Sequence, residues 1–139
     1  MEMNYGRLIK LADNQLIRQM DEYARQYDLT GTQMSILEFL ASTEGVCLQR
    51  DIEAEFSIRR STATVLLQRM QARDLVKQAR FAKDGRQKQV TLTTKGKQLQ
   101  QATQAYMDRI QAGFVEQFTA SERADFERML QYWIKGVVK

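Results

Sequence analysis

Basic side chains are concentrated in one quarter of the sequence, and they are the residues whose type and spacing could do chemistry. The segment from residue 57 to residue 90 holds nine basic and two acidic residues, a net charge of +7, whereas the remainder of the chain carries −3. Such a concentration favours a surface that binds a polyanion. The basic residues are Arg59, Arg60, Arg69, Arg73, Lys77, Arg80, Lys83, Arg86 and Lys88.

Catalytic and metal-binding chemistry finds little support in the sequence. There is no histidine and a single cysteine, Cys47, which excludes Ser-His-Asp and Cys-His catalysis and Cys/His metal-site spacing. Catalysis by Asp84, Lys83 or Tyr106 stays open as a minor alternative, although no paired carboxylates or phosphate-binding glycine loop support it. We therefore expect no enzyme activity, no metal and no cofactor.

Two short amphipathic helices follow one another at the start of the basic segment, and the second of them is basic. This order is the sequence form of a helix-turn-helix. Thr62, Val65, Gln68 and Arg69 fall on or near the exposed side of the second helix. The apolar positions that define the two helices are Leu48, Ile52 and Phe56 in the first and Ala63, Leu66, Leu67 and Met70 in the second.

A basic β-hairpin is expected directly after the second helix. Residues 75–81 and 88–93 read as short strands, and Asp84-Gly85 between them is a strong turn signal, because glycine accepts the positive φ that a tight reversal requires. A hairpin in this position is a wing. Asp74, which precedes it, is one of the few non-glycine residue types that tolerates a left-handed backbone.

Longer helices are predicted on both sides of this lobe. Residues 5–27 and the stretch after residue 94 carry apolar residues at helical spacing, and Thr30 with Gln33 forms a capping-box pattern. The expected fold class is mainly α with a small β-hairpin wing. We expect residues 1–139 to form a single domain, with the winged helix-turn-helix lobe at about 30–93 and dimerisation helices at about 5–27 and 94–138.

The apolar content predicts both the location of the protein and its assembly. No apolar run approaches the roughly 20 residues that cross a bilayer, so a cytoplasmic protein is expected. The terminal helices carry more apolar groups than peripheral helices around so small a core require, which predicts a dimer. Those groups include the tyrosines, Phe114, Phe118, Trp133 and Val137.

Four short motifs resemble the MarR family of bacterial transcription regulators. They are Leu29-Thr30-x-x-Gln33, Ser61-Thr62-x-Thr64, Asp84-x-Arg86 and Leu92-Thr93-x-x-Gly96, and in this order they span most of the chain. The resemblance implies a winged helix-turn-helix homodimer in which the first and last two helices intertwine. It also implies double-stranded DNA with a pseudo-palindromic operator as partner, and repression relieved by a small-molecule effector.

The candidate DNA-binding residues lie in the second helix and in the wing. Arg86 is the first choice, because a guanidinium at a hairpin tip can enter a narrow minor groove, and Asp84 is expected to orient it. Helix capping or local back-bonding is an equally open alternative for each hydroxyl. The full set is Arg60, Ser61, Thr62, Thr64, Gln68 and Arg69 in the helix and Lys83, Arg86 and Lys88 in the wing.

Two further expectations concern ligands and thiol chemistry. Leu11, Tyr23, Met34 and Leu37 are candidates for lining an effector pocket where the first two helices meet, with ordinary core packing as the alternative for each. Cys47 lies between apolar neighbours and is expected to be buried and inert. The main alternative function is a winged-helix module that binds a protein partner, or DNA without sequence preference, with a steep dependence on salt.

Overall fold

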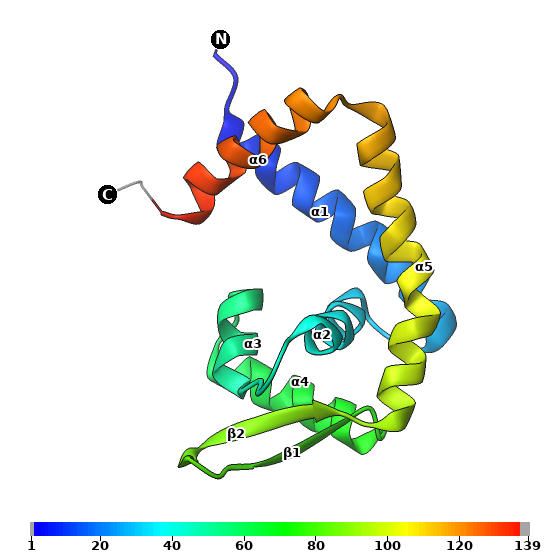
Figure 1. The fold of residues 1–139 in the computed structure, drawn as a ribbon, viewed down its shortest axis with the longest axis vertical. Helices are drawn as coiled ribbons and strands as arrows, with labels where there is room; N and C mark the ends of the chain where they lie inside the picture. Colours follow the sequence, from blue (N-terminus) through cyan, green and yellow to red (C-terminus); the bar gives the residue numbers. More distant parts are fainter. Residues whose placement is uncertain (1, 137–139) are drawn as a thin grey trace. The chain divides into compact units, whose positions relative to one another are not determined.

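The computed structural model describes residues 2–136 and is mainly helical, with a two-stranded antiparallel sheet (Figure 1). The elements confirm the predicted fold class, and the helix expected at 5–27 consists of α1 followed by the short 3₁₀ helix η1. In order they are α1 (Tyr5–Ala24), η1 (Arg25–Tyr27), α2 (Gly31–Ser42), α3 (Gln49–Phe56), α4 (Arg60–Ala72), β1 (Val76–Phe81), β2 (Asp84–Leu92), α5 (Thr94–Gln117) and α6 (Ala120–Ile134).

The chain divides into two compact units between Gln104 and Ala105. The first unit contains α1 to α4, both strands and the start of α5, and the second contains the remainder of α5 and α6. The lobe at about 30–93 and the helices at about 94–138 stay predictions as domain boundaries, and residues 137 and 138 lie outside the described residues. None of the described helices is both long enough and apolar enough to cross a membrane.

Side-chain caps fix where helices begin. Thr30 Oγ1 accepts from the Gln33 N–H at 3.1 Å and Gln33 Oε1 accepts from the Thr30 N–H at 3.0 Å, so the predicted capping box is present at the start of α2. The same reciprocal pair joins Thr119 and Glu122 at α6, and these hydrogen bonds lower the pKa of the Glu122 carboxyl. A cap of the Thr30 kind contributes roughly 1 kcal/mol.

Non-glycine residues in the left-handed conformation end three helical segments. They are Asp28 after η1, Ser57 after α3 and Asp74 after α4, with φ values of 57°, 52° and 60°. Asp is among the residue types whose short polar side chains occur at such positions. Asp74, whose residue type tolerates a left-handed backbone, adopts that conformation here, and it turns the chain from α4 into the wing.

The core of the first unit lies between α2, α3, α4 and the base of the wing. Full burial of one such apolar side chain contributes about 1.5–3 kcal/mol, so this cluster fixes α4 and the wing strands relative to one another. The large apolar residues that are fully buried in this core are Met34, Ile36, Leu37, Ile52, Leu67, Met70, Leu75, Val76 and Val90.

The wing pairs β1 with β2, and its turn lies elsewhere than predicted. Pairing runs regularly from Val76↔Leu92 to Arg80↔Lys88 and then shifts to Phe81↔Asp84, so Ala82 and Lys83 form the turn. The turn predicted at Asp84-Gly85 is wrong, since Asp84 already belongs to β2 and Gly85 does not have a positive φ. The three residues after Asp84 instead form a bulge in β2.

The base of the wing is attached to the segment before α3. Leu48 forms an isolated antiparallel bridge with Gln89, and the Val90 N–H donates to the Cys47 carbonyl at 2.9 Å. The Leu48 N–H in turn donates to Asp51 Oδ2 at 2.9 Å, which fixes the start of α3. The wing base and α3 therefore form one hydrogen-bonded assembly.

Candidate nucleic-acid interface

The outward face of α4 is exposed and combines polar side chains with Val65. Helical geometry places Ser61, Val65 and Gln68 on the side opposite the buried Ala63, Leu67 and Met70. All three outward residues are exposed, as are Thr62 and Arg69 on the flank. A shallow hollow of about 420 Å³ on this face is lined by Ser61, Thr62, Val65, Leu66 and Arg69.

The three hydroxyl groups at the start of α4 have different partners. The helix begins after Arg59 with no side-chain cap, and within residues 2–136 the hydroxyls of Ser61 and Thr62 have no recorded hydrogen-bond partner. The Thr64 hydroxyl donates to the Arg60 carbonyl at 2.9 Å and accepts from Gln49 Nε2 at 3.0 Å. The back-bonding alternative thus describes Thr64, whereas Ser61 and Thr62 can bond to an external partner.

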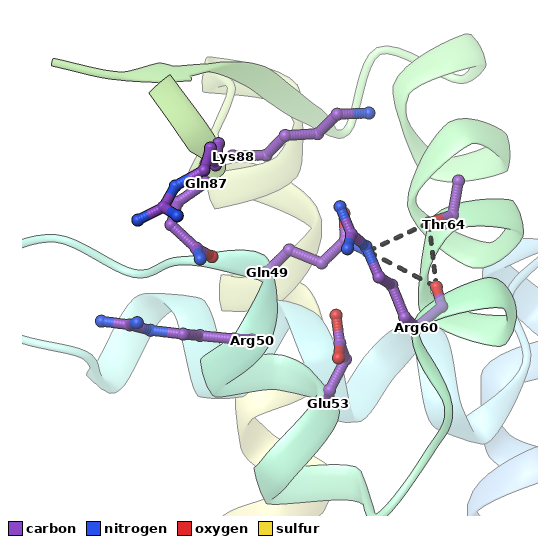
Figure 2. A pocket seen from close by; sticks show the side chains of 8 residues that line it. Gln49, Arg50, Glu53, Arg60, Thr64, Gln87 and Lys88 are labelled. Atoms are coloured by element: carbon purple, nitrogen blue, oxygen red, sulfur yellow. Dashed lines mark hydrogen bonds between the residues drawn. The ribbon is translucent and has the colours of Figure 1, made fainter. Parts of the chain in front are cut away.

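A second hollow, of about 170 Å³, lies where α3, α4 and the wing approach one another (Figure 2). Its walls carry four cationic side chains and one carboxylate, so it is suited to an anion such as a phosphate group. Sequence reasoning missed the contribution of α3, because no local signal marks it. The lining residues are Gln49, Arg50 and Glu53 from α3, Arg60 and Thr64 from α4, and Arg86, Gln87 and Lys88 from β2.

Asp84 holds the side chain of Arg86 at the bulge of the wing. Asp84 Oδ1 accepts from the backbone N–H and from Nε of Arg86, both at 3.1 Å, and Oδ2 accepts from Nη2 at 3.3 Å. These bonds to Arg86 lower the pKa of the Asp84 carboxyl. The Arg86 side chain is nevertheless 89% exposed. The expected orienting contact is present, and the guanidinium is oriented while still accessible.

The remaining wing candidates are accessible as well. Lys83 is exposed in the turn, and Lys88 is exposed opposite Arg80 on the paired strand. Like charges on directly opposite positions of a ladder repel one another, and a polyanion bound there would remove the repulsion. The wing therefore presents its cations outward.

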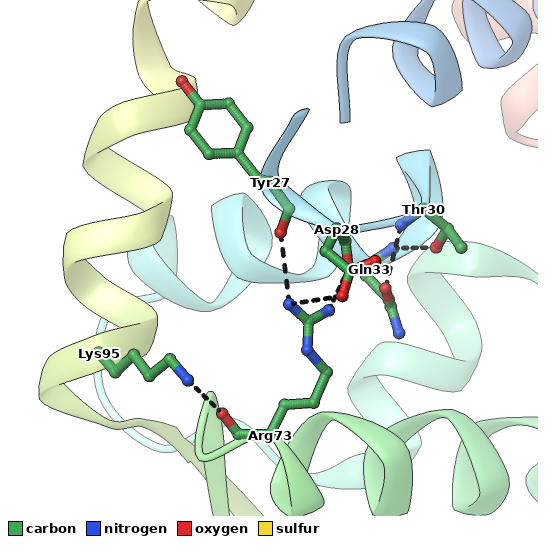
Figure 3. Close-up of polar contacts among 6 residues, drawn as sticks. All are labelled: Tyr27, Asp28, Thr30, Gln33, Arg73 and Lys95. Atoms are coloured by element: carbon green, nitrogen blue, oxygen red, sulfur yellow. Dashed lines mark hydrogen bonds and ion pairs between the residues drawn. The ribbon is translucent and has the colours of Figure 1, made fainter. Parts of the chain in front are cut away.

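Arg73 fixes the carboxyl end of α4 (Figure 3). Its guanidinium donates to the carbonyl of Asp28 and to that of Tyr27 at 3.3 Å, and it lies 4.0 Å from the Asp28 carboxylate. Lys95 Nζ donates to the Arg73 carbonyl at 3.1 Å, which joins the same point to α5. Arg73 belongs to the basic segment by sequence, but its side chain stabilises the fold through its contacts with Tyr27 and Asp28.

The four effector-pocket candidates differ in how far they are buried. Met34 and Leu37 have no exposed surface, so they are core residues in this structure. Leu11 is 46% exposed on α1, and the Tyr23 ring stacks at a tilt on Tyr27 with 5.8 Å between centroids. The alternative of ordinary packing therefore describes Met34 and Leu37, because the stripe that signals a pocket wall equally signals a core.

Cys47 is buried as expected, and we predict that its thiol reacts slowly. It is 4% exposed, and burial together with the charge of Asp51 raises the pKa of the thiol to about 11. This rise of roughly two pKa units lowers the thiolate fraction at pH 8 by about a hundredfold. Alkylation by iodoacetamide, followed by mass spectrometry, should be at least that much slower in the folded protein than in urea.

The same raised pKa gives the sign of a pH effect on stability. The folded state retains the Cys47 proton more tightly than the unfolded state, so the protonated thiol contributes to the stability of the folded protein. This stabilisation is complete below the ordinary thiol pKa. It is lost as the pH rises toward 11. For the alkylation experiment, equal rates in the folded and unfolded protein would contradict the slow reaction predicted for Cys47.

Two comparisons with known proteins match the sequence of the lobe. A model of the MarR family matches residues 27–87, from the end of η1 to the bulge of the wing. The HTH-type transcriptional regulator SarZ of Staphylococcus aureus is 28% identical over 116 residues, which cover 84% of this chain and 75% of SarZ. The residues that the family model matches include α4 and β1.

Solved structures extend the likeness to the terminal helices. S. aureus MepR in its DNA-binding conformation has the same fold, with a TM-score of 0.90 at 23% identity, covering 97% of this chain and 99% of MepR. The transcription regulator MarR from Oenococcus oeni PSU-1 is 42% identical with a TM-score of 0.81, covering 96% of this chain and all of that one. With this identity along its length and this winged architecture, the chain belongs to the MarR family of winged helix-turn-helix transcription regulators.

Proposed function

We propose that this protein is a homodimeric, sequence-specific regulator that binds a pseudo-palindromic operator and represses transcription until a small molecule releases it. The observation that carries the proposal is the exposed Arg86 guanidinium, which Asp84 orients at the wing of a lobe whose α4 presents free hydroxyls. The S. aureus MepR–DNA complex, which has this fold with a TM-score of 0.86, supports the same use of the lobe.

In this proposal α4 lies in the major groove with its outward face toward the bases. Gln68 and Arg69 have the donors and acceptors that pair with adenine and guanine edges, and Val65, 46% exposed, offers an apolar contact to a thymine methyl group. Ser61 and Thr62 bond to bases or phosphates through their free hydroxyls. The amino end of α4 adds partial positive charge toward a phosphate.

Arg60 and Lys88 then contact phosphates across the cationic hollow, beside Gln49 and Arg50 of α3. Thr64 acts indirectly, since its hydroxyl holds the Gln49 amide. Phosphate contacts of this kind position the protein on the duplex, whereas contacts to base edges specify the sequence. Arg86 enters the adjacent minor groove.

Lys83 offers a test of the phosphate contacts in the wing. Replacing Lys83 with alanine should weaken binding to operator and random duplex by a similar factor, because a phosphate contact carries no sequence information. The slope of log K against log salt should fall by about 2, because the dimer loses one phosphate contact from each protomer. Lys10→Ala on α1 removes another exposed cation and should leave the slope unchanged. A slope that Lys83→Ala does not alter would remove Lys83 from the interface.

Unpartnered apolar surface in both units supports the homodimer. In α1, Tyr5, Leu8, Leu11, Leu16 and Ile17 are 41–67% exposed, and α6 has no buried residue. Phe114, Phe118, Phe126 and Met129 line an apolar hollow of about 550 Å³ in the second unit. Apolar patches of this extent on a small chain indicate a protein interface.

We predict that Met129→Glu dissociates the dimer. Met129 is 53% exposed in the single chain, so a carboxylate there is tolerated by the protomer but becomes an unpaired buried charge in a dimer, at about 3–5 kcal/mol. The dimer dissociation constant should rise by at least a hundredfold, measured by sedimentation. Gln131→Glu, which adds the same charge at an exposed polar position of α6, should leave the dimer intact. A monomeric wild-type protein would refute the proposed assembly.

The deciding experiment compares the DNA upstream of the coding region of this protein with random duplex at matched salt. Binding to one inverted repeat about a hundredfold more tightly than to random DNA, about 2.8 kcal/mol, would establish an operator-specific regulator. Equal binding to both would favour a winged-helix module that binds DNA without sequence preference. Reporter expression with and without the protein then distinguishes repression from activation.

A further inference from the structure

Three elements of the first unit are joined by hydrogen bonds that form a closed ring (Figure 3). The Arg73 guanidinium, at the end of α4, donates to the carbonyls of Tyr27 and Asp28 at the end of η1. The Tyr27 hydroxyl donates to the Ala102 carbonyl of α5 at 3.4 Å. Lys95 Nζ of α5 donates back to the Arg73 carbonyl at 3.1 Å. This Arg73 ring, formed by Tyr27, Asp28, Arg73, Lys95 and Ala102, connects α4, η1 and α5.

Two helix ends of like partial charge meet in the Arg73 ring. The last carbonyls of a helix lack partners within the helix and carry partial negative charge. The carbonyls of Tyr27 and Asp28 end η1, and the carbonyl of Arg73 ends α4. A cation from another element binds each end, since Arg73 of α4 binds the first and Lys95 of α5 binds the second. The two cations thereby hold together helix ends that would otherwise repel each other.

The side chain of Arg73 is engaged by the protein, unlike that of Arg86 in the wing. It is 32% exposed, against 89% for Arg86. Its planar fork binds two carbonyls at once and lies 4.0 Å from the Asp28 carboxylate. A lysine cannot reproduce this arrangement, because its ammonium is a single compact donor on a flexible stem. Arg73 is therefore suited to holding two helices together.

The location of the Arg73 ring makes it a determinant of where α4 points. The core packs α4 against α3 and the wing base, whereas the ring attaches its carboxyl end to η1 and α5. Helix α1 leads into η1 and carries part of the apolar surface assigned to the proposed dimer. In that dimer the orientation of α4 relative to α1 sets the separation of the two α4 helices. One extra base pair between half-sites moves the second by about 3.4 Å and turns it by about 35°.

We propose that Arg73 is a positioning residue for DNA binding, which fixes the separation of the two α4 helices in the dimer and so restricts binding to one spacing of the half-sites. The part that concerns DNA rests on the proposed function, whereas the orientation of α4 is a property of the protein alone. In this role Arg73 determines specificity without touching the duplex.

Spin-label distances test the orientation of α4 without DNA. Labels on the Thr62→Cys and Gln98→Cys variants, at exposed positions of α4 and α5, report a distance within one chain. The full-length protein also carries Cys47→Ala and is mixed with an excess of unlabelled protein, so that pairs within one chain dominate. The distance distribution should be narrow with Arg73 and should broaden in Arg73→Ala. An unchanged distribution would overturn the positioning role whether or not an operator is bound.

Duplexes whose half-sites are one base pair closer or further apart test the consequence for DNA. Fluorescence anisotropy at matched salt should show that the wild type binds them about tenfold or more weakly than the operator, because one half-site loses its base contacts. In Arg73→Ala this spacing penalty should shrink to about threefold, because a less restricted α4 can follow the displaced half-site. Arg73→Lys should give an intermediate penalty, since an ammonium can still bind one carbonyl.

The dependence on salt separates this role from a direct phosphate contact. Loss of a phosphate contact from each protomer would lower the slope of log K against log salt by about 2, whereas loss of a positioning residue leaves the slope unchanged. Arg25→Ala is the matched control, because it removes an exposed arginine of η1 that does not belong to the Arg73 ring. It should keep the full spacing penalty. A lower slope in Arg73→Ala together with a full spacing penalty would overturn the proposal.

Lys95→Met tests the same ring if Arg73→Ala fails to fold, which thermal melting will show. It removes only the bond to the Arg73 carbonyl and leaves the guanidinium in place, so the protein should fold and the spacing penalty should shrink. A full penalty in both Lys95→Met and Arg73→Lys would overturn the proposal. Failure of the wild type to prefer any operator would count against the proposed function, while the spin-label distances still decide the role of Arg73 in orienting α4.

Discussion

Replacing Arg86 with alanine will weaken operator binding by about 1–3 kcal/mol, the range for a specific side-chain contact. The reason is local, since the Arg86 side chain is 89% exposed and its guanidinium is already oriented by two hydrogen bonds to Asp84. Little conformational entropy is therefore lost when it enters a groove. Fluorescence anisotropy with the operator at fixed salt measures the loss, and thermal melting should show no change in stability.

Arg128→Ala is the matched control, because Arg128 is also an exposed arginine beside a carboxylate, Asp125, three residues away. It should leave DNA affinity unchanged. Asp84→Asn makes the test sharper, because it should weaken binding when Arg86 is present and strengthen it in the Arg86→Ala background, where only its repulsion of phosphates remains. The same sign in both backgrounds would exclude an orienting role for Asp84.

Gly96→Ala should destabilise the protein by about 3 kcal/mol or more. A Cβ at Gly96 would lie 2.1 Å from the Leu75 carbonyl oxygen, a backbone atom of the buried wing base that cannot move alone. Two hydrogen bonds of Thr93 hold Gly96 close to Leu75. Thr93 Oγ1 accepts from the Gly96 N–H at 2.9 Å and donates to the Asp74 carbonyl at 2.6 Å. Thermal melting at one protein concentration should show the midpoint lowered by about 10 °C.

Gly113→Ala provides the comparison within the same helix. No atom lies within 4 Å of the position that a Cβ would take there. Alanine should therefore stabilise α5 by about 0.5–1 kcal/mol through its helix propensity. A Gly96→Ala protein as stable as the wild type would show that the start of α5 can move away from the wing base.

The features that sequence predicts well in this protein depend on contacts between near neighbours. Thr30 caps α2 together with Gln33, three residues away, and Asp84 binds Arg86, two residues away. The left-handed backbone of Asp74 follows from its residue type at a helix end. Amphipathic spacing also predicts where the helices lie, because apolar side chains three or four residues apart lie on one face of a helix.

The features that sequence missed depend on contacts between distant residues. Gln49 and Thr64 are 15 positions apart, and their hydrogen bond turns the Thr64 hydroxyl inward. Arg73 binds the Tyr27 carbonyl 46 positions away, which gives a basic residue a structural role. The wing turn was misplaced because the Asp84 carboxylate, which would favour a turn at Asp84-Gly85, bonds to Arg86 and stabilises a bulge instead.

The hydrogen bond from Val90 to the Cys47 carbonyl has a mechanical consequence for the wing. The base of the hairpin is clamped on a third segment, whereas the ladder beyond Arg80 and Lys88 has only two strands and a bulge. The part of the wing that is bonded to the third segment is therefore more rigid than its tip. In the proposed complex, the attached part of the wing would fix the distance from α4 to the groove, and the more flexible tip would let Arg86 enter minor grooves of different widths. Binding should then depend on the stiffness and minor-groove width of the duplex that flanks the operator. Base changes there that preserve both properties should leave the affinity unchanged.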